Sequence, residues 1–464
     1  MRSIRFGALG LAILLVGPRE LALAQFQSPV IVQLPTPEGS FGFGLASGDV
    51  NGDGIADLVV GAVLADVDNK TNAGKVFIFF GGSPVETSAD VVLQAPAPER
   101  GARFGWAIAL GDVNRDGGTD IIVSALFANG GEQQGTGKVY IFFGGPSLDA
   151  QADGELPLPS LNPRARFGWA LAVGDVNGDG WADVLVGAEN VRIGGRDQAG
   201  RAFLYEGGPS LFPGTPRELQ SPTPQEGAAF GSAVAIGDVT GDGMGDVLVG
   251  APNEDAGSAP HAGRVHLFFG GSPFDTTADA VLQQPVPLRQ SGFGKALAVG
   301  DVNGDGIEDV IVGTPHPNLT RFPFSATSNP GEVHLFFGGR PLDVVADLTL
   351  RAPSPAQNDN FGGAVAVGNV VGDAAADILV GSVAIKGRSV VGSAYLFAGG
   401  SALDAAADVT FHASASDPNA QFSVALAIRD INSDGRGDVL IGSIKPGTLG
   451  LPAGQGKVYV FLAS

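Results

Sequence analysis

The chain has 464 residues, a formal net charge of −21 and no cysteine. The negative charge argues against nucleic acid as a partner, and the absence of cysteine excludes a disulfide framework. Glycine accounts for 72 residues and charged residues for only 16%, which is typical of a turn-rich protein with large buried faces.

Residues 1–24 have the pattern of a secretory signal peptide. Arg2 and Arg5 precede an apolar stretch of about a dozen residues, and Ala22-Leu23-Ala24 forms a small-x-small cleavage site. A membrane helix would need roughly 20 apolar residues. We therefore expect a mature protein, 25–464, that has no membrane span and is secreted or lies in the periplasm or at the cell surface.

From about residue 30 onward, one unit is repeated seven times. Each copy opens with a short strand that begins, in most copies, with Phe-Gly, and this strand runs into an acidic nine-residue loop. A supersecondary unit repeated in this way must bury its apolar faces against its neighbours. No linker-like break interrupts the repeat, so we predict a single domain. The spacings between successive loops are 63, 63, 63, 63, 68 and 61 residues, and the loops begin at Asp49, Asp112, Asp175, Asp238, Asp301, Asn369 and Asp430.

Each copy predicts four short strands. In the second copy the first strand, 104–111, alternates bulky residues with Gly or Ala, so we expect burial on both of its faces. In the first copy the second strand, 57–61, is a continuous apolar run bounded by Gly, the third spans 74–82, and the fourth, 89–94, has the weakest pattern.

The two ends of the chain indicate how the repeats close. The chain stops at the third strand of the seventh copy, and a spare strand of the fourth type, 30–34, precedes the first copy. Pairing this strand with the last copy would join two exposed sheet edges. We therefore predict an all-β, seven-bladed β-propeller with four antiparallel strands per blade, closed by the N-terminal strand. An open solenoid would not need the displaced strand.

The acidic loops are candidate calcium sites. Positions 1, 3, 5 and 9 carry side-chain oxygens, Gly at position 6 permits a sharp turn, and the carbonyl of position 7 adds a ligand. One Asp-Gly turn is also typical of a hairpin, but six nearly complete copies indicate about six structural calcium ions. The predicted ligands are Asp49, Asn51, Asp53, Ile55, Asp57, Asp112, Asn114, Asp116, Gly118, Asp120, Asp175, Asn177, Asp179, Trp181, Asp183, Asp238, Thr240, Asp242, Met244, Asp246, Asp301, Asn303, Asp305, Ile307, Asp309, Asp430, Asn432, Asp434, Arg436 and Asp438.

The sixth loop departs from this pattern. Asn369, Val371 and Ala374 replace the usual Asp, Asn and Gly, and only Asp373 and Asp377 remain as carboxylates. We expect this loop to bind calcium weakly or not at all. Thr240 in the fourth loop is a milder change, because a hydroxyl can still coordinate calcium.

The repeat resembles the FG-GAP repeats that form the seven-bladed propeller of integrin α subunits. The Phe-Gly opening, the Asp-x-Asn-x-Asp-Gly-x-x-Asp loop and a closing Gly-Ala-Pro at 250–252 carry the resemblance, which covers essentially the whole mature chain. It implies structural calcium on the face opposite the ligand-binding face. Integrin α subunits carry such loops only in their later blades, whereas here they begin with the first. Their leg domains, membrane span and cytoplasmic tail have no counterpart in this sequence, so we expect no heterodimeric integrin signalling.

Two further features attract attention. Arg436-Gly437-Asp438 spells the tripeptide that integrins recognise, but Asp438 is position 9 of the seventh loop, so we expect its carboxylate to face metal. The five histidines have no catalytic or metal-binding spacing. We expect His266 and His334 to be packed or rim side chains, while His261 and His316 lie in loops that could face a ligand.

No catalytic constellation is recognisable in the sequence. It has no Ser elbow and no His-Glu-x-x-His, and calcium binding explains the abundant aspartates, so we expect that the chain is not an enzyme. A lyase or hydrolase that uses one of these carboxylates is a less favoured alternative.

Ligand binding is expected on the face opposite the calcium loops. Antiparallel strands put the acidic loops and the turns after the third strands on one face, and the remaining loops on the other. On the second face, the loops after the second strands differ most between copies: 64–73, 127–136, 190–199, 253–262 and 316–330. Because recognition usually resides in variable loops, we predict a monomeric, adhesion-type module that binds an extracellular protein or a surface glycan. A lectin with glycan sites between blades is the alternative.

One position of the first strand is aromatic in three consecutive copies. Phe43, Trp106 and Trp169 stand there, whereas later copies have Ser232, Lys295, Gly363 and Val424. We expect packing between blades, with exposed anchors for a ligand as the alternative.

Overall fold

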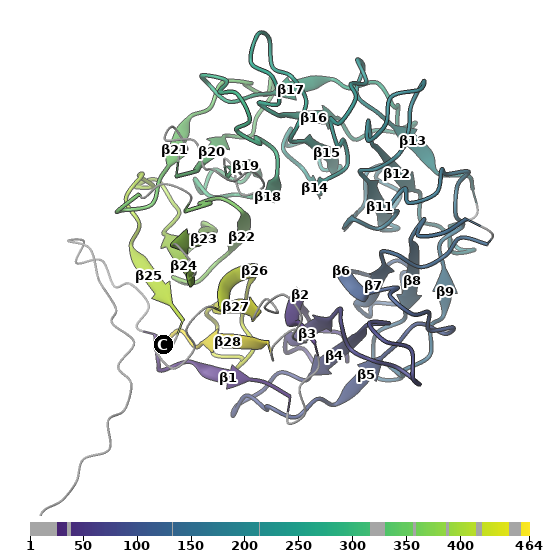
Figure 1. Cartoon of the computed structure of the whole chain (residues 1–464). Helices are drawn as coiled ribbons and strands as arrows, with labels where there is room; N and C mark the ends of the chain where they lie inside the picture. Colours follow the sequence, from purple (N-terminus) through teal and green to yellow (C-terminus); the bar gives the residue numbers. More distant parts are fainter. Residues whose placement is uncertain are drawn as a thin grey trace, which may run out of the picture.

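The computed structural model describes residues 26–34, 39–131, 133–212, 214–315, 330–355, 359–386, 389–413, 420–444 and 456–464. The described residues form seven four-stranded antiparallel sheets and no helix. Figure 1 shows these sheets as blades arranged in a ring around a common axis. The predicted all-β, seven-bladed propeller is confirmed.

Within each blade, the four strands lie side by side in order from the centre of the ring to its rim. The innermost strands are β2 (Phe41–Gly48), β6 (Phe104–Gly111), β10 (Ala170–Gly174), β14 (Ala233–Gly237), β18 (Ala296–Gly300), β22 (Ala364–Gly368) and β26 (Gln421–Arg429). The second strands are β3 (Asp57–Ala62), β7 (Asp120–Ala125), β11 (Asp183–Ala188), β15 (Asp246–Ala251), β19 (Asp309–Thr314), β23 (Asp377–Lys386) and β27 (Asp438–Ile444).

The third strands are β4 (Lys75–Phe79), β8 (Lys138–Phe142), β12 (Arg201–Tyr205), β16 (Arg264–Phe268), β20 (Glu332–Phe336), β24 (Ser389–Phe397) and β28 (Lys457–Phe461). The outer strands are β5 (Val91–Leu93), β9 (Gly154–Glu155), β13 (Arg217–Leu219), β17 (Ala280–Leu282), β21 (Leu348–Leu350), β25 (Val409–His412) and β1 (Val30–Val32). We number the blades by copy, so the first blade begins with β2 and the seventh combines β26, β27 and β28 with β1.

The N-terminal strand closes the ring as predicted. β1 pairs antiparallel with β28, with Val30 opposite Val460 and Val32 opposite Val458. A second contact joins the first and seventh blades, because the Gly82 N–H donates a hydrogen bond to the Ile431 carbonyl at 2.8 Å. The two ends of the repeat are therefore joined at the edge of one sheet and at one loop.

Apolar packing between neighbouring blades holds the ring together. The phenylalanine of each Phe-Gly opening, or its counterpart, has no exposed surface: Phe41, Phe104, Phe167, Phe230, Phe293, Phe361 and Phe422. The glycine after it allows the backbones of two blades to approach closely. A Cβ atom at Gly61 in the first blade would lie 2.2 Å from the Gly105 carbonyl oxygen in the second, and Gly105 itself has a φ of +87°.

The innermost strands are less buried than we predicted. In β6 only Phe104 and Gly105 are buried and the other six residues are half-buried, because this edge strand faces the axis of the ring and no further strand covers it. In the third blade, regular pairing starts only at Ala170. The preceding residues form a turn in which the Trp169 N–H donates to the Arg166 carbonyl at 3.1 Å.

Some sequence-based expectations lie outside the described residues. These are the signal peptide at 1–24, His316 and most of the loop 316–330. Within the part of the chain that the structure describes, no helix is long and apolar enough to cross a membrane.

Candidate metal centres

The first acidic loop is folded by hydrogen bonds from its own backbone to the predicted ligands. Asp49 Oδ2 accepts from the Gly54 N–H at 2.8 Å, Asn51 Oδ1 from the Asp53 N–H at 2.8 Å, and Asp53 Oδ1 from the Ile55 N–H at 2.8 Å. Asn51 Nδ2 also donates to Asp53 Oδ2 at 3.0 Å. The side chains of positions 1, 3 and 5 are thereby brought together at the exposed end of the blade.

The other complete loops repeat the bond between position 1 and position 6. Its acceptors are Asp112, Asp175, Asp238, Asp301 and Asp430, at 2.7 to 2.9 Å. In the sixth loop, Asn369 accepts instead from the Gly372 N–H at 2.6 Å, and Val371 provides no side-chain oxygen.

Position 9 fastens the acidic loop to the rest of its blade. Asp57 Oδ2 accepts from the Val50 N–H at 2.8 Å, and its Oδ1 accepts at 2.8 Å from the N–H of Gly81, in the turn after the third strand. All seven position-9 aspartates make such a bond to this turn or, in the seventh blade, to Ala463. The sixth loop keeps this bond through Asp377. We conclude that position 9 has a structural role in every blade, whether or not the loop binds metal.

Burial changes the acidity of the position-9 carboxyls. Loss of hydration raises the pKa of Asp183 to about 7, although N–H bonds from Val176 and Gly207 oppose the rise, and the charges of Asp175 and Asp179 add to it. Burial likewise raises the pKa to about 6 in five further loops, at Asp57, Asp120, Asp246, Asp309 and Asp438.

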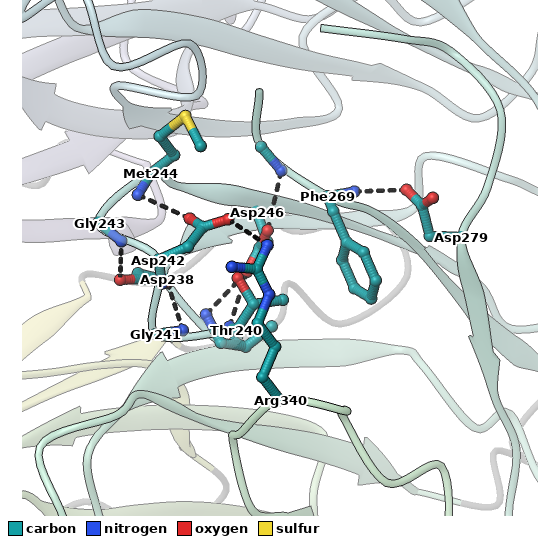
Figure 2. A network of polar contacts seen from close by, with 12 residues as sticks. Asp238, Thr240, Gly241, Asp242, Gly243, Met244, Asp246, Phe269, Asp279 and Arg340 are labelled. Carbon is teal, nitrogen blue, oxygen red and sulfur yellow. Dashed lines mark hydrogen bonds and ion pairs between the residues drawn. The ribbon is translucent and has the colours of Figure 1, made fainter. Parts of the chain in front are cut away.

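The fourth loop differs from the other complete loops in that one of its carboxylates forms an ion pair. Arg340, in the turn after β20 of the fifth blade, places Nη2 2.9 Å from Asp242 Oδ2. Figure 2 shows this guanidinium reaching the loop that holds Asp238 and Thr240. Within the described residues, the predicted carboxylates of the first, second, third, fifth and seventh loops have no ion pair with a Lys or Arg side chain.

The donor chemistry of these loops fits a hard divalent cation. Each complete loop offers side-chain oxygens at four positions, and each carboxylate oxygen has about two lone pairs, so one N–H bond does not exhaust it. Among the described residues, however, no three His, Cys, Asp or Glu side chains are arranged as a group that could hold a metal ion.

The aromatic residues predicted at one position lie in a row on the opposite face. The ring centroids of Phe43 and Trp106 are 4.6 Å apart, and those of Trp106 and Trp169 are 5.1 Å apart. All three side chains are half-buried. They therefore pack between blades, as expected, and also keep part of their surface exposed.

The structure also places the histidines and the Arg-Gly-Asp tripeptide. His266 and His334 are buried, and His266 Nε2 lies 2.9 Å from Glu254 Oε2. His261 lines an open cavity of about 630 Å³ between the third and fourth blades, together with Arg196. Asp438 is fully buried, so the tripeptide is not available to a partner.

Comparisons with known proteins support this assignment of the repeat. FG-GAP repeat models match residues 41–79, 104–142, 167–205, 230–268 and 293–336. Five of the seven repeats of this seven-bladed propeller thus match the FG-GAP repeat. The chain is 29% identical to Xenopus laevis integrin alpha-5 over 220 residues, 46% of this chain and 20% of that protein. A subtype N11 neuraminidase-like protein of A/flat-faced bat/Peru/033/2010 aligns over 87% of this chain and 98% of that one, with 11% identity and a TM-score of 0.37.

The relatives also correct one expectation. Phosphatidylinositol-glycan-specific phospholipase D of Bos taurus is 29% identical over 196 residues, which is 41% of this chain and 23% of the enzyme. Our expectation that the chain is not an enzyme is therefore wrong. The sequence that led to it is similar to part of an enzyme. The chain matches about a quarter or less of the length of these relatives.

Proposed function

We propose that this chain is a calcium-stabilised binding module that acts outside the cytoplasm. The proposal rests on the difference between the two faces of the propeller. One face, the acidic face, carries near-identical loops that are fastened to the turns after the third strands. The other, the variable face, carries loops that differ between blades, and the integrin relatives suggest that it binds a protein.

Calcium is assigned to the acidic face as a structural ion. Positions 1, 3 and 5 of the complete loops would hold it, with the position-7 carbonyl and the position-9 carboxylate completing the set. Bound calcium would offset the repulsion between carboxylates such as Asp175, Asp179 and Asp183, whose side chains have no ion pair among the described residues.

Hydrogen bonds on the variable face transmit this support to the binding loops. The Gly101 N–H donates to the Thr71 carbonyl at 2.9 Å, and the Arg103 N–H donates to the Asn72 carbonyl at 3.2 Å. A loop of the first blade is thereby attached to the segment that leads into the second blade. Rigid blades held by calcium would keep such loops in fixed relative positions.

A capture experiment tests the binding role. The mature protein, in calcium, is used to recover partners from its native extracellular milieu and is also applied to a glycan array. We expect a protein partner whose capture is lost in the Trp106→Ala, Trp169→Ala double variant, while the melting temperature changes little. Several equivalent glycan sites would support a lectin instead. Failure of the wild-type protein to bind either class would contradict the proposal, and a large loss of stability in the variant would assign both tryptophans to the core.

A further inference from the structure

The variable face carries a cluster of cations around the aromatic row. The Arg103 guanidinium lies 4.9 Å from the Phe127 ring centroid and 5.8 Å from that of Trp106. One blade further on, Arg166 lies 5.3 Å from the Trp169 centroid. The arrangement of an arginine three residues before a tryptophan is thus repeated in the second and third blades.

Lys295 completes the cluster from the fifth blade. Its Nζ lies 5.4 Å from the Trp169 ring centroid in the third blade. Ser232, at the same repeat position in the intervening fourth blade, is small and only 6% exposed, so it leaves room for this contact. Two cations and the Trp106 ring of the same chain therefore already lie against Trp169, and the groups that the cluster offers to a ligand are the cations.

Positive charge exceeds negative charge in this cluster. Arg166 pairs with Glu189 at 2.6 Å, and Ser232 Oγ donates to the same carboxylate at 3.2 Å. Arg103 and Lys295 have no carboxylate partner among the described residues. Burial, and to a lesser degree the charge of Arg166, lower the pKa of Arg103, which indicates that the guanidinium is partly desolvated beside a like charge.

The backbone that presents the two arginines is strained. Arg103 has a φ of 57° and Arg166 a φ of 61°, in the left-handed region that costs about 1 kcal/mol for a residue with a side chain. Gly292 stands at the same repeat position in the fifth blade and adopts a φ of 72° without that cost. The same left-handed conformation occurs at this position in other blades, at Ser40, Ala229 and Asn360, so it belongs to the repeat and fixes where the two arginines stand.

We infer that Arg103, Arg166 and Lys295, on the aromatic row, form a docking site for an acidic segment of a protein partner. This inference rests on the proposed binding role and names the chemistry of its partner. The chain as a whole has a net charge of −21, so a cluster of cations on one face is a local exception. Such a cluster is complementary in charge to an acidic segment and would fix the position at which that segment binds. Because cations and neighbouring rings of this chain already lie against Trp106 and Trp169, a sugar ring that stacks on an open aromatic face is a poorer fit.

The strand position that holds Trp106 and Trp169 borders a cavity in two other blades. In the sixth and seventh blades these positions are Gly363 and Val424, and they line a cavity of about 220 Å³ together with Asn360, Gln421 and Ser423. The sixth blade lies next to the blade that carries Lys295.

The test uses the full chain in calcium with a fluorophore-labelled glutamate-rich peptide. Its glutamine counterpart and an oligogalacturonate, a polyacid of sugars, are measured beside it by fluorescence anisotropy. We expect the acidic peptide to bind more tightly than the other two. The Arg103→Gln, Lys295→Met double variant is expected to weaken that binding by about tenfold or more, with an unchanged melting temperature.

Arg100→Gln is the matched control, because it removes an exposed charge from the segment that also holds Arg103. It should change the affinity by less than about twofold. Three results would overturn the inference: no binding of the acidic peptide by the wild-type protein, equal weakening by Arg100→Gln, or tighter binding of the oligogalacturonate. If the double variant still captures the protein partner recovered by the wild-type chain, the docking site is wrong and the binding role stands.

Discussion

Arg340 Nη2 lies 2.9 Å from Asp242 Oδ2 and joins the turn after the third strand of the fifth blade to the acidic loop of the fourth. The guanidinium supplies to this loop the positive charge that a metal ion would supply elsewhere. The fourth loop also has Thr240 in place of the usual asparagine. We therefore expect it to have the lowest calcium affinity of the six complete loops.

Replacing Arg340 with glutamine should raise the affinity of the fourth loop for calcium. The arginine competes with the ion for Asp242, and since Arg340 is 68% exposed, the gain should be modest, roughly two- to tenfold. Calorimetric calcium titration measures it. Arg351→Gln, which removes a different exposed arginine from its pair with Glu332, serves as the control. An unchanged or weaker fourth site in Arg340→Gln would show that the pair does not compete with metal.

Asp179→Ala should lower stability in calcium more than Asp373→Ala. Both residues occupy position 5, and each accepts an N–H bond from the residue two positions later, at 2.9 and 3.0 Å. Both variants therefore lose the same hydrogen bond. Because the loops of a repeat act as local units, any remaining difference in stability between the two variants is due to the metal.

Metal stoichiometry and melting in chelator complete this comparison. Asp179→Ala should lose one bound ion and Asp373→Ala none, and the two melting temperatures should converge in chelator. Seven equally tight sites in the wild-type protein would show that our interpretation of Asn369 and Val371 is wrong.

The calcium-free protein should become less stable as the pH rises from about 4.5 to 7. The pKa of Asp57 is raised from 3.8 to about 6 in the folded state, and that of Asp183 to about 7. Between the unfolded and folded pKa values the folded state binds more protons, so the stability from these groups is present at low pH and is lost as they ionise. The window begins at 4.5 because Glu332 acts in the opposite sense at lower pH. The His334 imidazole, with Nε2 3.4 Å from Glu332 Oε2, and the Arg351 guanidinium lower the pKa of Glu332 to about 2, so protonation of that group destabilises the fold.

Bound calcium should weaken or reverse this slope, since it favours the ionised carboxylates. Chemical denaturation in chelator and in calcium, at several pH values, provides the measurement. Equal or greater stability of the chelated protein at pH 7 than at pH 4.5 would contradict the assignment of raised pKa values to position 9.

The repeat made the architecture predictable from the sequence. Each Phe-Gly opening marks where two blades touch, as the contact between Gly61 and Gly105 shows, and the spare strand at Val30 predicted the pairing with β28. The exposure of the innermost strands was not predictable from alternation alone. Bulky and small residues alternate in β6 as they would in a fully buried strand, and only the ring places this strand beside its axis.

The sites were predictable only where they are local in sequence. Positions 1, 3 and 5 of each loop lie within five residues, so their grouping follows from the spacing. The bond from Gly81 to Asp57 spans 24 residues, and the Arg340 to Asp242 pair spans 98. The contact of Lys295 with Trp169 skips a whole blade. These contacts depend on how the blades are placed around the ring, and a local sequence pattern does not give that placement.

Thermal melting of residues 25–464 with and without chelator tests the central claim of a calcium-stabilised propeller. At about 1 mM calcium and a dissociation constant near 0.1 mM, each occupied site contributes about 1.4 kcal/mol, and the five complete loops whose carboxylates have no arginine ion pair contribute roughly 7 kcal/mol. That is comparable to the whole stability of a typical domain. We predict a large fall in melting temperature on chelation, restored by calcium; an unchanged melting temperature would contradict the account.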